Sequence, residues 1–404
     1  MVTPSGTLSQ EHLPRIVRPA VVVDADSAAN HRKERGTTLN NIDTETKRRW
    51  RSKLAGAAVV AVLASAGPAL AIPAGFNNEI DTVRGVGSDT TYFALQNVDK
   101  LYNASPGCTL NSGDAFESCV SDGTVISENH DHDEVLSAFP SGSSNGVRGV
   151  CGTLSGTATL ASNYARSSRD KQSSDCTGLT FKAFARDAIV PLIFPNGGAP
   201  SAGVTNLSKS QLLGIFTQPC TINNWNQLGG PNAPIIPWGV QTGSGTYLSF
   251  RNFLDGLDPN GCAGGISETN RTPFIIFENN AAPIAAAGAT VQSRSIHWFS
   301  YGRFVSAPFT RAGGSSTQIN SITATPATIS GLGSTYPARR FLWNVFRTAG
   351  VTQATSTYLD WTCKTTAHAI DPETGKNYDA LIGSAISSTG FIRLKGANCV
   401  TETT

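Results

Sequence analysis

The segment IIPWGVQTGSGTYLSFRNFL, residues 235–254, contains the structural unit from which this chain is predicted to be built. Its apolar start predicts a short strand, Gly243-Ser244-Gly245-Thr246 predicts a turn into a helix, and the apolar spacing that follows predicts a helix ending near Leu254. A helix N-terminus presents unpaired backbone N–H groups and a partial positive charge. The segment is therefore interpreted as a strand, a Gly/Ser loop and a helix whose first turn suits an anion.

The same unit recurs near the start of the folded part of the chain. Residues 82–87 predict a strand, and residues 91–102 predict the helix that follows it, with apolar side chains on one face. The loop between them places three polar residues at the helix N-terminus, namely Ser88, Asp89 and Thr90.

Further elements indicate an α/β fold. Residues 188–194 form a continuous apolar run of the buried-strand type, and residues 208–216 predict a short helix that begins after a Ser cap. Residues 340–345 and 390–394 predict late strands. The Ser/Thr-rich stretch 313–334 is expected to be a loop.

Four Ser/Thr/Gly loops could bind an anion at the beginning of a helix. An ordinary cap or turn is the alternative for each loop alone, because these residues favour such positions. The number of loops favours a shared anion site. The candidate residues are Ser88, Asp89 and Thr90; Ser141, Ser143 and Ser144; Arg166, Ser167 and Ser168; and Gly243, Ser244, Gly245 and Thr246.

The order of these motifs resembles that of the periplasmic phosphate-binding proteins of ABC transporters, in the type II periplasmic-binding-protein superfamily. The similarity covers residues 81–394. Its most specific part is the succession of Leu207-Ser208-Lys209-Ser210-Gln211-Leu212, Thr221-Ile222-Asn223-Asn224-Trp225-Asn226 and Thr242-Gly243-Ser244-Gly245-Thr246.

The resemblance implies a two-lobed α/β fold of that type, with the ligand in the cleft between the lobes. The first lobe is expected at 78–186 and again at 337–404, and the second at 187–336. It further implies a monomer without a cofactor that captures a small oxyanion, phosphate first, and delivers it to an ABC transporter permease. Another oxyanion or a phosphorylated compound is the alternative ligand.

Two positions depart from the pattern of that family. Val240 stands where an Arg is usual, and Ser168 stands where an Asp usually accepts the proton of phosphate. Arg166 and Arg169 are candidates to replace the missing positive charge, unless they are solvated surface residues. Asp89 is the candidate acceptor, with a plain helix cap as its alternative role.

The N-terminal 71 residues are predicted to be a polar extension followed by a signal peptide. A basic region at 47–53 precedes an apolar run at 54–66, and Ala69-Leu70-Ala71 is a small-x-small cleavage site. The apolar run is too short for a typical membrane anchor. The mature protein is therefore expected in the periplasmic, cell-wall or extracellular space.

The charge balance of the mature chain argues against nucleic acid and anionic membranes as partners. Cleavage after Ala71 removes ten of the 31 Lys and Arg residues and six of the 29 Asp and Glu residues, which leaves a net charge of −2. An anion must then be held by local hydrogen-bond donors.

An even number of cysteines in an exported chain indicates disulfides. The count leaves the pairing open, and we favour sequential pairing because it closes four modest loops. A metal cluster is the alternative, although no C-x-x-C pair occurs. The favoured pairs are Cys108–Cys119, Cys151–Cys176, Cys220–Cys262 and Cys363–Cys399.

Two rival functions come from other classes. Residues 142–146 spell G-x-S-x-G, so a secreted serine hydrolase could use Ser144 with His297 or His368. The Gly-rich stretch 147–155 is expected to be a poor helix, which weakens that interpretation. An acidic turn around His130 and His132 could bind a metal, but a solvated turn is the simpler interpretation. No nucleotide P-loop motif is present.

Overall fold

The computed structural model describes residues 81–104, 125–129, 142–154, 162–331, 333–363 and 374–404 of the 404-residue chain. The chain divides into two compact units, Met1–Ala74 and Gly75–Thr404, and every described residue belongs to the second unit. The predicted signal peptide lies outside the described residues. Among the described residues, none of the helices has the length and apolar character needed to cross a membrane.

A mixed sheet runs through this unit, in the strand order β2, β1, β3, β12, β4, β9, β6. β1 pairs in parallel with β2 and β3, whereas β12 and β9 run antiparallel to β4. Three short strands, β10, β13 and β14, also pair with β4. The strands are β1 (Asp81–Gly87), β2 (Val125–Asn129), β3 (Tyr164–Ser167), β4 (Leu179–Ile193), β5 (Asn206–Leu207), β6 (Ile236–Pro237), β7 (Gly239–Val240), β8 (Ile275–Ile276), β9 (Ser295–Ser300), β10 (Ser315–Ser316), β11 (Gln318–Ile319), β12 (Arg339–Arg347), β13 (Ile392–Arg393) and β14 (Thr401–Thr403).

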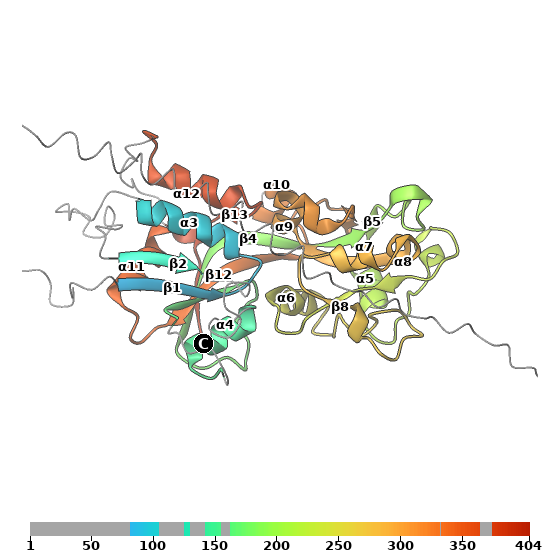
Figure 1. Cartoon of the computed structure of the whole chain (residues 1–404), viewed down its shortest axis with the longest axis horizontal. Helices are drawn as coiled ribbons and strands as arrows, with labels where there is room; N and C mark the ends of the chain where they lie inside the picture. The colour runs from blue at the N-terminus through green and yellow to red at the C-terminus, as the bar shows by residue number, and fades with distance from the viewer. Residues whose placement is uncertain (1–80, 105–124, 130–141, 155–161, 332, 364–373) are drawn as a thin grey trace, which may run out of the picture. The chain divides into compact units, whose positions relative to one another are not determined.

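Helices alternate with these strands, which confirms the predicted α/β class. α3 packs against α12 and over β2, and α4 packs against β3, β1 and β12. In Figure 1, α3 and α12 lie above the strands of the sheet and α4 lies below them. The helices are α3 (Tyr92–Ala104), α4 (Ser143–Cys151), α5 (Lys209–Phe216), α6 (Gly245–Phe253), α7 (Ala282–Ala286), α8 (Ala289–Arg294), α9 (Tyr301–Ser306), α10 (Pro326–Ser330), α11 (Gln353–Trp361) and α12 (Tyr378–Ser387).

The long strand β4 takes part in two hydrophobic cores. Its first ten residues pair with β12, from Leu179 opposite Arg347 to Ala188 opposite Arg339. Its last five residues pair with β9, from Ile189 opposite Ser300 onward. The predicted buried run at 188–194 thus covers the C-terminal part of a strand that continues through both cores, together with Phe194 just after it.

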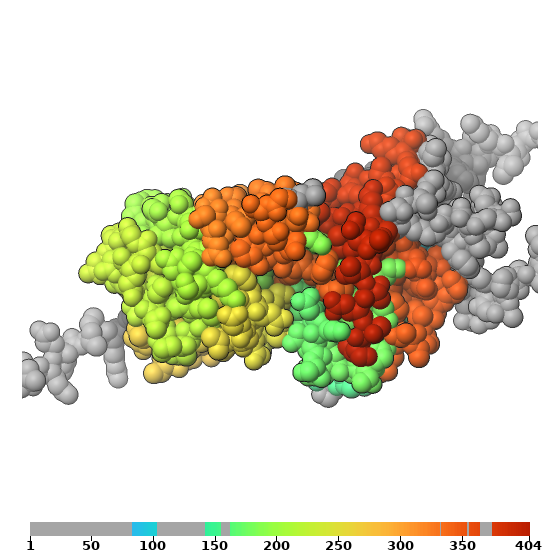
Figure 2. Space-filling model, turned by 180° about the vertical axis from the view of Figure 1, so that it is seen from behind, coloured from blue at the N-terminus to red at the C-terminus, as the bar shows by residue number. Residues whose placement is uncertain are grey.

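The two cores are made of different parts of the chain. The first core contains buried residues from 83–185 and 342–399, and the second contains buried residues from 188–338. Aromatic rings occupy the centre of each, such as Tyr102 against Trp361 in the first and Phe216 against Trp298 in the second. Seen from behind in Figure 2, the yellow-green to orange surface of the segment that surrounds the second core adjoins the green and red surface of the segments that surround the first.

The local signals at helix starts are largely realised. Ser208 caps α5 through a capping box with Gln211, as its position predicted. Ser244 caps α6, so the Gly-Ser-Gly-Thr loop does open a helix. These short helices satisfy their first N–H groups locally and bury their apolar face in the second core.

Two expectations about local structure were wrong. Of the Gly-rich stretch 147–155, residues 147–151 are helical as the end of α4. Gly146 in this helix packs so closely on β1 that an added Cβ would lie 2.7 Å from the Gly87 Cα atom. Tertiary packing therefore overrides weak helix propensity. The stretch 313–334 is not a plain loop, because it contains β10, β11 and α10, which begins at the Thr325 cap and at Pro326.

Three of the predicted disulfides are present in the structure. Cys151–Cys176 and Cys363–Cys399 join parts of the first core, and Cys220–Cys262 joins two loops beside the second. Cys108 and Cys119 lie outside the described residues.

Candidate ligand-binding site

The N-terminus of α6 forms one side of the candidate site. The Ser244 hydroxyl accepts hydrogen bonds from the N–H groups of Thr246 and Tyr247 at 3.0 and 3.1 Å. A Cβ atom at Gly245 would lie 2.2 Å from the Ser143 Oγ atom and 2.3 Å from the Ser168 Oγ atom, so a side chain cannot fit there. The first turn of α6 therefore rests directly on the loops of the first core.

Four hydroxyl side chains from the first core surround this turn, and all are buried. The Ser168 Oγ atom lies 3.1 Å from the Ser88 Oγ atom and 3.3 Å from the Ser143 Oγ atom. The Thr90 Oγ1 atom lies 3.2 Å from the Thr246 Oγ1 atom. The structure thus brings Ser88, Thr90, Ser143 and Ser168 together with the start of α6, and their shared role in binding a ligand stays a prediction.

Other candidate residues in the same loops make local contacts. The Ser167 hydroxyl donates to the Arg169 carbonyl and accepts from the Arg169 N–H group. Ser144 accepts from the Arg169 Nε–H group, and its backbone N–H donates to the Gly243 carbonyl across the two cores at 3.3 Å. Asp89 is half-buried at the loop before α3. Ser141 lies outside the described residues.

The two arginines suggested as substitutes for the charge missing at Val240 are engaged elsewhere. The Arg166 guanidinium donates to the carbonyls of Ser88 and Gly85, at 3.3 and 2.9 Å, and so braces the loop after β1. The Arg169 guanidinium forms a bidentate ion pair with Asp175 at 2.7 and 2.9 Å. Both side chains are buried rather than solvated. Arg166 stabilises the loop after β1, and Arg169 stabilises the loop after β3.

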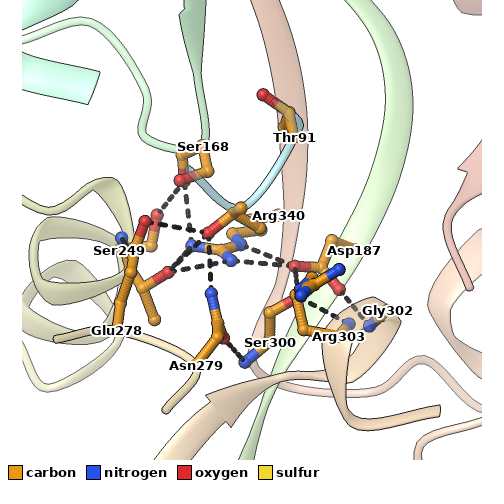
Figure 3. A network of polar contacts seen from close by, with 12 residues as sticks. Thr91, Ser168, Asp187, Ser249, Glu278, Asn279, Ser300, Gly302, Arg303 and Arg340 are labelled. Carbon is orange, nitrogen blue, oxygen red and sulfur yellow. Dashed lines mark hydrogen bonds and ion pairs between the residues drawn. The ribbon is translucent and has the colours of Figure 1, made fainter. Parts of the chain in front are cut away.

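Arg340 supplies the positive charge at the site, and the sequence interpretation missed it (Figure 3). Its Nη1 atom donates to the Ser168 carbonyl at 3.0 Å and to the Thr246 Oγ1 atom at 3.1 Å. Its Nε and Nη2 atoms donate to Asp187, whose carboxylate also accepts from the Ser300 hydroxyl at 2.8 Å. β12 and β4 thus hold a buried ion pair against α6.

Glu278 was also missed. This buried carboxylate accepts from the Thr90 hydroxyl at 3.1 Å, from the Thr246 N–H group at 3.2 Å and from the Ser244 hydroxyl. Its neighbour Asn279 donates to the Thr90 Oγ1 atom at 3.0 Å and accepts from the Ser300 N–H group at 2.8 Å. The loop after β8 therefore enters the site from the second core, as Figure 3 shows.

Some sequence signals could have pointed to these residues. Asp187 stands at the head of the apolar run 188–194, and a charge next to a buried strand needs a partner. Arg340 likewise opens an apolar strand. Glu278 follows Ile275-Ile276-Phe277 and carries no such periodic signal, so its place depends on the fold alone.

The described part of the structure does not support the two rival functions, a serine hydrolase and a metal site. Ser144 contacts Arg169 rather than a histidine, and His297 lies in the second core with its Nδ1 atom 3.1 Å from the Trp238 carbonyl oxygen. Burial lowers the pKa of His297 to about 4. His130, His132 and His368 lie outside the described residues, among which no group of His, Cys, Asp and Glu is placed to hold a metal ion.

Comparison with known proteins agrees with this architecture. Residues 74–365 match the model of a PBP superfamily domain. A protein from Clostridium perfringens, assigned as a phosphate ABC transporter substrate-binding protein and solved with bound phosphate, has 18% identity and a TM-score of 0.51, with 78% of this chain and 100% of that chain covered. An ABC-type phosphate transport receptor from Vibrio cholerae has 16% identity and a TM-score of 0.48, with 77% and 99% covered. No curated protein matches the chain in sequence.

Proposed function

The chain belongs to the PBP superfamily, and from that premise we propose that it is an exported solute-binding protein that captures a small oxyanion for an ABC transporter. The observation that carries this proposal is the convergence of hydroxyl and N–H donors from both cores at the start of α6, beside the Arg340 guanidinium. Phosphate is the first candidate ligand. The names of the Clostridium and Vibrio proteins support that choice.

The two cores would be the two lobes of the binding protein. The first lobe would comprise 78–186 and 337–404, and the second 187–336, with β4 and β12 crossing between them. An oxyanion would bind where the first turn of α6 meets Ser88, Asp89, Thr90, Ser143 and Ser168. Binding at this place would favour the closed arrangement of the lobes, and the closed, ligand-bound form would be the one that a permease recognises.

Local donors rather than net charge would hold the anion. Arg340 would take the part of the arginine that Val240 replaces, since it already touches Thr246 and Ser168. Hydrogen bonds from hydroxyl and N–H groups to an ionised oxyanion are each stronger than neutral ones. No covalent chemistry is needed, so we do not propose a hydrolase that uses Ser144.

Calorimetric titration of phosphate into the purified protein tests this function. Replacing Ser143 and Ser168 together by Ala should weaken phosphate binding by at least about 2 kcal/mol, because each hydroxyl lost to a charged ligand costs about 1 kcal/mol or more. Ser201→Ala is the matched control, since Ser201 is buried but lies in a turn beside the second core. Equal affinity in the folded double variant and the control would remove these loops from the site.

The remaining parts of the proposal concern the context of the protein. Signal-peptide cleavage after Ala71 would release a monomer into the periplasmic or cell-wall space, where a permease would be its partner. A thermal-shift comparison of phosphate, sulfate and molybdate would rank the candidate ligands, because a ligand that binds only the native state raises its stability.

A further inference from the structure

Glu278 has the contacts of a bound anion. Each of its two carboxylate oxygens is hydrogen-bonded, and the donors are the Thr90 hydroxyl, the Ser244 hydroxyl and the Thr246 N–H group. The last two lie at the N-terminus of α6, Ser244 as the cap residue and Thr246 in the first turn, where the helix dipole favours negative charge. The side chain is 6% exposed, so these protein groups rather than water solvate the carboxylate.

The same donors are those that the proposed function assigns to the oxyanion. The Ser244 hydroxyl donates its one hydrogen to Glu278, and the single Thr246 N–H hydrogen is shared between the Ser244 Oγ atom at 3.0 Å and the Glu278 carboxylate at 3.2 Å. An oxyanion that used these two donors would therefore have to take the place of the carboxylate. Arg340 would add attraction for the oxyanion, but Asp187, 2.8 Å from its Nη2 atom, offsets part of its charge.

Glu278 also joins the two cores. Its loop follows β8 on the second core, whereas Thr90 belongs to the loop between β1 and α3 on the first. Asn279 reinforces this link, because it donates to the same Thr90 oxygen. A single carboxylate thus connects the α6 start with the facing lobe in the way that a ligand of a closed binding protein would.

We propose that Glu278 is an internal competitor of the oxyanion, a latch that closes the cleft without ligand and lowers the affinity for the anion. The inference rests on the proposed function. The flanking Phe277 is 60% exposed, so the loop lies at the surface and the displaced carboxylate has a short path to water. Binding then exchanges one anion for another at α6.

Glu278→Gln tests the latch because it keeps the size of the side chain and removes its charge. Phosphate should bind this variant at least about tenfold more tightly than wild type, since the neutral amide is a weaker partner for the α6 donors. The ligand-free variant should also be more open, with a larger radius of gyration in small-angle scattering. Glu278→Ala serves as a second variant, with the same expected direction of change.

Glu268→Gln is the matched control, because Glu268 is in the same lobe and its backbone lies in a turn with Gly265, outside the site. It should bind phosphate and scatter as wild type does. Unchanged or weaker phosphate binding by folded Glu278→Gln and Glu278→Ala, relative to binding wild type, would overturn the latch; a weaker affinity would make Glu278 a direct ligand group instead. If no protein binds phosphate but both Glu278 variants open in solution, the latch stands and the proposed phosphate function fails.

Discussion

Replacing Arg340 by Met should be among the most damaging single changes to the stability of this fold. The Arg340 side chain is 3% exposed and the Asp187 side chain is fully buried, so the variant would leave a carboxylate in the interior without its counter-charge. Removing one partner of a buried ion pair costs about 3–5 kcal/mol. The hydrogen bonds from Ser300 and Gly302 to Asp187, at 2.8 and 3.0 Å, would remain in the variant. The loss of stability should therefore lie near the lower end of that range.

The assay is urea denaturation monitored by tryptophan fluorescence. Wild type, Arg340→Met, Asp187→Asn and the double variant are compared as a double-mutant cycle. Because each single change leaves the other group unpaired, the double variant should lose at least about 2 kcal/mol less than the sum of the single losses. The loss of stability in Arg340→Lys should lie between zero and that of Arg340→Met. The lysine ammonium keeps the positive charge, but it lacks the planar group that lets the guanidinium contact Asp187, Ser168 and Thr246 together.

Arg339→Met is the neighbouring control. Arg339 is exposed on the same strand, so its loss should change the free energy of unfolding by no more than about 0.5 kcal/mol. The reasoning would be refuted by a loss below about 1 kcal/mol in Arg340→Met, or by strictly additive losses in the cycle.

Four further predictions follow from the structure and the sequence. Gly245→Ala should abolish phosphate binding in calorimetry while the fold persists in circular dichroism, because the new methyl group would clash with Ser143 Oγ and hold the lobes apart; retained affinity would contradict the close approach. The pKa of His297 is about 4 in the folded protein and about 6.5 in the unfolded chain, so the free energy of unfolding should fall by up to about 3 kcal/mol as the pH falls from 6.5 to 4. Denaturation curves of His297→Asn should lack this part of the pH dependence. Asp89→Asn should weaken phosphate and strengthen sulfate in parallel titrations if Asp89 accepts the ligand proton, whereas equal changes would indicate a helix cap. The intact mass of the exported product should correspond to cleavage after Ala71 and four disulfides, and any free thiol under denaturing conditions would count against complete pairing.

Local patterns explain how much of the fold could be predicted. Apolar periodicity and capping residues, which depend only on neighbours in the sequence, predict strand β1, helices α5 and α6 and the apolar C-terminal part of β4. They do not predict helix α4, because its glycines favour a loop and only the close contact of Gly146 with β1 explains the helix. Its formation depends on packing that a sequence window does not contain.

The candidate site likewise contains residues that local sequence patterns predict and residues that only the three-dimensional fold brings in. The hydroxyl loops were predictable because Ser, Thr and Gly at helix starts have a local meaning. Arg340 and Glu278 were not, since they reach the α6 start from β12 and from the loop after β8, about 94 and 32 residues away in the chain. Long-range partners of this kind become visible once the strands are in register.

The division of the chain between the two cores also bears on how the protein assembles. The described residues of the second core form one continuous stretch, 188–338, whereas the first core combines 83–185 with 342–399. A chain synthesised from its N-terminus can therefore contain the whole second core before the first is complete, because the first core needs β12 to pair with β4 across a sequence gap of about 150 residues. Completion of the first core therefore depends on the C-terminal segment from β12 onward, which supplies Leu342, Trp343 and the other buried residues up to Cys399.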